Sequence, residues 1–79
     1  QALAVWNNAF VLRMSQHLAE RVKEASPELA GQVGEAVELV LGRAARPDEL
    51  AAYEAYARRH GLANLARVLF NTNEFVFVD

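Results

Sequence analysis

Apolar residues recur at helical spacing in four consecutive stretches of the chain, and the joints between these stretches are only a few residues long. The last stretch gives the clearest pattern, because Leu62, Leu65, Ala66 and Leu69 follow the i, i+3, i+4, i+7 spacing of one helix face. Short joints place consecutive helices beside one another, so that each face is buried by its neighbours. We therefore predict an all-α fold, a compact bundle of four main helices over residues 8–25, 27–41, 47–60 and 62–71.

The length of the chain sets the number of domains. With 79 residues there is room for one hydrophobic core, so we predict a single helical domain over residues 1–79. Because 53% of the residues are hydrophobic and only 23% are charged, the composition excludes a disordered chain. We also expect a short helix ahead of residue 8 and an extended tail in which Phe75 and Phe77 anchor the C-terminus. The chain starts at Gln1, and we expect it to be a C-terminal fragment of a larger protein.

The same spacing predicts which residues of each helix face the core. We expect Val11, Met14, Leu18, Val22 and Ala25 in the first helix, Leu29, Val33, Ala36, Val37, Val40 and Leu41 in the second, and Leu50, Tyr53 and Ala57 in the third. Gly31 and Gly34 lie inside the second helix, where each weakens the helix by up to about 1 kcal/mol relative to Ala. Their presence indicates either a closely packed neighbour or frayed first turns.

Polar residues and glycines stand where helices begin and end. Asn and Ser side chains accept hydrogen bonds from the free amides of a first turn, and Gly or Asn tolerates the positive φ that ends a helix. The predicted caps are Asn8 and Ser26 at helix starts, Gly42, Gly61 and a left-handed Asn71 at helix ends, and Asn73 before a final turn. On this interpretation residues 71–74 finish a helix and are not a ligand site.

No set of residues matches a catalytic or metal-binding pattern. The chain has no cysteine, and zinc bound by His17 or His60 would need further ligands at a defined spacing that the sequence lacks. Paired acids such as Asp48 and Glu49 fit the first turn of a helix, where they complement its dipole. We predict a non-enzymatic chain without catalytic residues, metal site or cofactor.

Basic side chains near the two ends of the third helix could form a patch that binds phosphate or a partner's carboxylates. This patch requires the third helix to fold back beside the Gly42 turn, and it would contain Arg43, Arg46, Arg58, Arg59 and His60. The favoured alternative is that Arg43 caps the carbonyls of the preceding helix while the other side chains are solvated. Glu74 is a further candidate contact.

Charge and hydropathy narrow the classes of partner. The net charge is −2, and the arginines are scattered among acids instead of forming one basic face, which argues against nucleic-acid binding. No apolar run approaches the roughly 18 residues of a membrane span, so we predict no membrane insertion. Seven aromatic residues are too many for one small core to hide, and we expect some of them to form an apolar patch that docks onto another domain.

Three motifs in order carry a family resemblance. They are QALAVWNNAFVLR, AVELVLGRAARPDELAAYEAY and LARVLFNTNEFVFVD, and together they span nearly the whole chain. This order resembles the C-terminal part of a planctomycete-specific domain of unknown function, whose pattern reads QAL, two hydrophobics, NNPFV, then LALGRPPTPEEL, then LNSNEFLYVD. The chain departs from that pattern at Ala9, Ala44, Ala45 and Arg46, which stand where the family has prolines and a threonine cap. The motifs LGRxxxP and NxNEF are also similar to short helical repeats of surface-layer and linker proteins.

The resemblance implies a location and a set of neighbours. Members look like parts of large exported proteins that also carry a cytochrome c-like module, so the resemblance implies an extracytoplasmic or periplasmic protein. The haem attachment signature CxxCH is absent from this chain, which places any haem in another segment. We expect the partners to be upstream domains of the parent protein.

Two functions from different classes are consistent with these residues. The first is a non-catalytic packing or interaction module. The alternative is a subdomain that lends Arg43, Asn73 or Glu74 to an active site completed by upstream chain.

Overall fold

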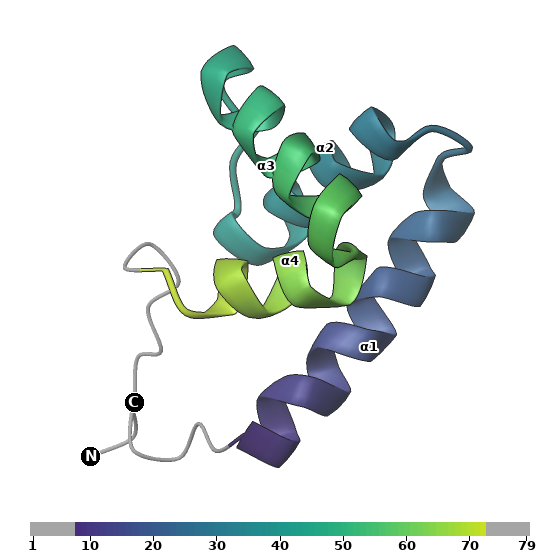
Figure 1. Ribbon diagram of the computed structural model, residues 1–79, viewed down its shortest axis with the longest axis vertical. Helices are drawn as coiled ribbons and strands as arrows, with labels where there is room; N and C mark the ends of the chain where they lie inside the picture. The colour runs from purple at the N-terminus through teal and green to yellow at the C-terminus, as the bar shows by residue number, and fades with distance from the viewer. Residues whose placement is uncertain (1–7, 73–79) are drawn as a thin grey trace.

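The computed structural model describes residues 8–72, which form four helices and no strand. These helices are α1 (Asn8–Ala25), α2 (Leu29–Leu41), α3 (Pro47–His60) and α4 (Leu62–Phe70) (Figure 1). The predicted all-α bundle of four main helices is confirmed. The predicted leading helix, the extended tail, Asn73 and Glu74 lie outside the described residues, as does the side chain of Asn8.

Helices α2 and α4 form the centre of the bundle, since each of them packs against the other three helices. Within residues 8–72, α1 and α3 do not pack against each other. Figure 1 shows α4 crossing the middle of the molecule, with α3 on one side and α1 on the other. The nine-residue helix α4 buries Leu62, Leu65, Ala66 and Leu69, at the spacing that the sequence predicts.

The core joins these four residues of α4 to the inner faces of the other helices. Val22, Val33, Val37, Leu65 and Leu69 have no exposed surface at all. Burying an aliphatic side chain of this size stabilises a fold by about 1.5–3 kcal/mol. These five side chains come from α1, α2 and α4, so the three helices depend on one another for burial.

Helix α1 buries only part of the predicted stripe, in which Leu18 is partly buried against the core. Val11 and Val22 are buried as expected, but Ser15 and Ala19 take the central positions, and Met14 is 39% exposed. The predicted stripe was wrong at Met14 and at Ala25, which is also exposed. Both side chains are small, and the distance between packed helices depends on the side chains at the contact.

The start of α2 also differs from the prediction, which placed Ser26 as the cap of a helix from residue 27. The helix begins at Leu29, and Glu28 precedes it with extended backbone and no side-chain cap. The Ser26 hydroxyl accepts a hydrogen bond from the Glu28 N–H at 3.3 Å, and Gln32 Nε2 donates to the Ser26 carbonyl at 2.9 Å. Ser26 therefore forms a local turn ahead of the helix, a common alternative to capping for serine.

Glycines end α2 and α3. Gly42 has φ 75° and ψ 18°, the left-handed conformation, and its N–H donates to the Glu38 carbonyl at 3.0 Å. Gly61 has φ 94° and alone connects α3 to α4, and its N–H donates to the Ala57 carbonyl at 2.7 Å. Because only glycine adopts positive φ without steric cost, both positions match the predicted helix ends.

The two glycines inside α2 differ in their surroundings. A Cβ atom on Gly31 would lie 2.9 Å from the Ser26 Cβ and would also meet the Ser26 hydroxyl, whereas a Cβ on Gly34 would meet nothing within 4 Å. The turn before α2 is therefore the close neighbour that Gly31 requires. The structure gives no packing reason for Gly34.

We predict that Gly34→Ala raises the free energy of unfolding by up to about 1 kcal/mol, because alanine is the better helix former and the added methyl has room. Gly31→Ala is the matched substitution in the same helix and should give less than this gain or a loss, since Ser26 must move. Urea unfolding of the two variants measures the difference. Equal gains would show that the turn at Ser26 yields freely.

Ser15 is the buried polar side chain at the centre of α1. It has no exposed surface, and its Oγ makes no hydrogen bond within the described residues. A buried hydroxyl without a partner costs about 1–3 kcal/mol of desolvation free energy. The small Ser15 side chain occupies this buried position, although burial of its hydroxyl is unfavourable by the desolvation free energy.

We predict that Ser15→Ala raises the free energy of unfolding by about 1 kcal/mol, because it removes the unpaired hydroxyl and improves helix propensity. Chemical unfolding followed by circular dichroism measures the change. Ser15→Val is the control, because its larger side chain should destabilise a position that needs a small one. A less stable alanine variant would contradict an unpaired Ser15.

Candidate functional site

The turn between α2 and α3 is closed by an arginine–carboxylate pair. Arg43 donates from both terminal nitrogens to the two oxygens of Glu49, each at 2.8 Å. The Glu49 side chain is 13% exposed and that of Arg43 is 31% exposed. Two parallel charge-assisted hydrogen bonds hold both groups in a fixed orientation, so this pair fixes the approach of α3 to the end of α2.

Glu49 also completes the start of α3. Its Oε1 accepts a hydrogen bond from the Arg46 N–H at 3.1 Å, and its Oε2 lies 3.1 Å from Arg46 Nη2. The hydrogen bonds from Arg43 and then from the Arg46 backbone lower the pKa of Glu49 from 4.5 to about 2. These contacts explain why a glutamate stands in the first turn of α3, beyond the helix-dipole role predicted for it.

The basic residues that could have formed one patch do not converge. Arg46 precedes α3 and Arg58 lies twelve residues later, so a continuous helix separates them by about 18 Å. Arg58 pairs with Glu54 at 2.7 Å on its own helix, and the His60 ring lies 4.5 Å from the Tyr56 ring. The favoured alternative placed Arg43 on the carbonyls of α2, whereas the hydrogen bonds described for its guanidinium go to Glu49 and to the Ala44 carbonyl.

Because the pKa of Glu49 is lowered in the folded chain, the stability of the fold should depend on pH. The charged form of Glu49 stabilises the fold above its unfolded-state pKa near 4.5, and this contribution is lost as the pH falls from there toward 2. Glu49→Gln should therefore lower the melting temperature at pH 7 but have a progressively smaller effect as the pH falls toward 2. Thermal unfolding at a series of pH values measures the difference.

Asp48→Asn is the matched control for this experiment. Asp48 lies in the same turn, but its side chain is 79% exposed and its closest contact to Arg46 is 3.8 Å. Exposed pairs of this kind contribute little to stability, so the control should differ little from the wild type at any pH. A Glu49→Gln effect that stays constant down to pH 2 would contradict the assignment.

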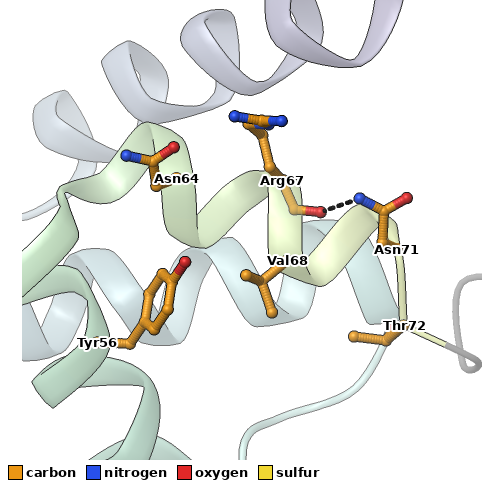
Figure 2. Close-up of a pocket in the computed structure, with 6 residues that line it drawn as sticks. All are labelled: Tyr56, Asn64, Arg67, Val68, Asn71 and Thr72. Carbon is orange, nitrogen blue, oxygen red and sulfur yellow. Dashed lines mark hydrogen bonds between the residues drawn. The ribbon is translucent and has the colours of Figure 1, made fainter. Parts of the chain in front are cut away.

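A depression of about 490 Å³ lies between α3 and the end of α4. It is lined by Tyr56, Asn64, Arg67, Val68, Asn71 and Thr72 (Figure 2). Its polar groups already serve the helix ends, since Asn64 Nδ2 donates to the His60 carbonyl and Thr72 Oγ1 to the Leu69 carbonyl. In Figure 2 the Arg67 side chain points away from Tyr56 and Val68. The depression therefore lacks the convergent polar groups of a ligand site.

Asn71 ends α4 in a way that the sequence did not predict. Its φ is −99° and its ψ is 7°, so the predicted left-handed conformation is wrong. The side-chain Nδ2 instead donates to the Arg67 carbonyl at 2.9 Å, and the backbone N–H donates to the same carbonyl at 3.2 Å (Figure 2). Two donors on one residue satisfy the end of α4 without a change to positive φ.

A second depression, which we name the apolar groove, lies where α1, α2 and α4 meet. It has a volume of about 280 Å³ and is lined by Met14, His17, Leu18, Arg21, Leu39, Val40 and Phe70. Met14 is 39% exposed and Leu39 is 41% exposed, although both are large apolar side chains. The groove is therefore apolar surface that the described part of the chain leaves in contact with water.

The sequence predicts an exposed apolar patch that contains aromatic residues. It places Met14 in the core and makes no assignment for Leu39. Among the aromatic residues between positions 8 and 72, Phe70 alone lines the groove. One signal was available, because Leu39 is a large apolar residue off the buried face of α2, beside the buried Val40.

Residues 8–72 contain neither a metal-binding group of side chains nor a membrane-spanning helix. These residues contain no group of three or more histidine and acidic side chains placed to bind a metal ion. None of their helices combines the length and the apolar character that crossing a bilayer requires.

Comparison with known proteins identifies the family. A model of the PSD1 family, described as proteins of unknown function (DUF1553), matches residues 1–57. The chain belongs to this family. The matched residues contain α1, α2 and most of α3, and thus every described residue that lines the apolar groove except Phe70. No curated protein and no solved structure matches the chain.

Proposed function

We propose that this PSD1 family chain is a non-catalytic helical interaction module of a larger protein, and that it packs against other domains of that protein through the apolar groove. The observation that carries the proposal is the water-exposed apolar surface of Met14 and Leu39 at the junction of three helices. Contiguous exposed apolar surface with polar surroundings is typical of protein–protein contacts.

The shape of the groove supports the same interpretation. Leu18 and Phe70 are half-buried at its floor and Val40 is buried, so an incoming apolar side chain would contact carbon on several sides. Concave apolar surface of this kind places most of the binding energy in a few central contacts. Met14 adds an unbranched, flexible side chain that adapts to the shape of a partner.

The alternative function is a subdomain that completes an active site with Arg43, Asn73 or Glu74. Arg43 is a poor candidate for this role because it already binds Glu49. Arg43 would have to release Glu49, to which it makes two hydrogen bonds of 2.8 Å, before it could bind a substrate. Asn73 and Glu74 lie outside the described residues. No feature of residues 8–72 favours this alternative over docking.

The finer assignment depends on the resemblance of the three sequence motifs. We propose that the parent is one of the large planctomycete proteins with a cytochrome c-like module, and that it works in the periplasm or another extracytoplasmic space. The motif LGRAARPDEL, which contains Arg43 and Glu49, supports this assignment. Detection of the parent in a periplasmic fraction by an antibody against this chain tests the location.

We predict that the 79-residue chain binds the remaining domains of its parent when the two are produced separately and mixed. Leu39→Glu should weaken this binding tenfold or more, which corresponds to about 1.4 kcal/mol, because it places a charge in the apolar groove. Isothermal titration calorimetry measures both affinities. Circular dichroism of the Leu39→Glu variant checks that its helices remain folded.

Leu12→Glu is the matched control for the docking experiment. Leu12 is 44% exposed on the same helix as Met14 but does not line the groove. This variant should bind as well as the wild type. Absence of binding by the wild-type chain would overturn the proposed function, and equal weakening by both variants would remove the groove from it.

A further inference from the structure

The apolar groove has a charge pattern in addition to its apolar surface. Five of its lining residues are apolar, and the other two, His17 and Arg21, are basic. No carboxylate from residues 8–72 lines the groove. Met14 and Arg21 are seven residues apart on α1, which separates them by about 10 Å, or two helical turns. The groove thus joins apolar surface at Met14 to a cation two turns away.

The cation at this end of the groove, Arg21, has no partner within the described part of the chain. Arg21 is exposed and forms no ion pair or hydrogen bond with any residue between 8 and 72. Glu24 lies one turn away on the same helix, yet no ion pair joins the two. Arginine binds carboxylates through two parallel hydrogen bonds, so an unpaired guanidinium beside apolar surface selects for an acidic group.

We propose that the occupant of the apolar groove is an amphipathic helix with apolar side chains at one end and a carboxylate about two turns further along. This inference rests on the proposed docking function and adds the chemistry of the partner. An amphipathic helix in a groove presents residues at i, i+4 and i+7 to one surface. Apolar residues at the first two positions would meet Met14, Leu39 and Phe70, and the acid at the third would meet Arg21.

A second copy of the chain fits this surface less well. In a two-fold symmetric contact the same patch faces itself. The Arg21 guanidinium groups of both copies would then share one interface, to which the groove residues between 8 and 72 contribute no carboxylate. Burying like charges together is unfavourable, whereas an acidic helix supplies the missing partner.

The chain contains one methionine, Met14, which makes the groove directly observable. The experiment uses the 79-residue chain prepared without an initiator methionine and labelled with ¹³C at the Met14 methyl. The probes are two synthetic amphipathic helical peptides of about four turns with identical apolar residues. One peptide carries Glu at the position two turns after the first apolar residue, and the other carries Lys.

We predict that the Glu peptide shifts the Met14 methyl resonance and binds at least about tenfold more tightly than the Lys peptide. Arg21→Glu should reverse this preference. Arg13→Glu is the matched control, because Arg13 is exposed on the same helix but does not line the groove, and it should retain the preference for Glu. Equal affinity for the two peptides, or no shift with either, would overturn the proposal.

Photo-methionine at position 14 distinguishes the other occupants. Cross-links to the Glu peptide support the proposal. Cross-links to a second copy, or only to residues 73–79 of the same chain in the presence of saturating peptide, overturn it. In one further outcome, the parent domains bind the wild-type chain more tightly than the Leu39→Glu variant while the two peptides bind with equal affinity. That result would support the docking function and contradict the charge preference.

Discussion

Burial of α4 by three other helices is the interaction on which the rest of the structure depends. A helix of nine residues is too short to be stable in water by itself. It persists because Leu65 and Leu69 are completely enclosed, and the helices around it lose their own buried surface if it unfolds. The fold is therefore one cooperative unit over the described residues and not a row of independent helices.

The Arg43–Glu49 pair complements this core at the edge of the bundle. Aliphatic packing is non-directional, whereas two hydrogen bonds of 2.8 Å between planar groups define an orientation. The pair sets how α3 leaves the Gly42 turn, and α3 in turn covers one side of α2 and α4. Arg43 was predicted as a contact for other molecules, but its geometry is that of a structural residue.

The apolar groove is a consequence of how α1 packs. The buried face of α1 contains the small residues Ser15 and Ala19. Met14 lies beside this face and is partly exposed at the junction with α2 and α4. Met14 and Arg21, which lie on the same helix, both line this groove.

Much of the architecture follows from the sequence alone, because helix periodicity and positive-φ glycines are local properties. The spacing of Leu62, Leu65, Ala66 and Leu69 and the stops at Gly42 and Gly61 each depend on residues within a few positions. The face of α1, the role of Arg43 and the groove were decided only by tertiary structure. Each depends on atoms brought together from separate helices, where packing distance and ion-pair geometry outweigh the local pattern.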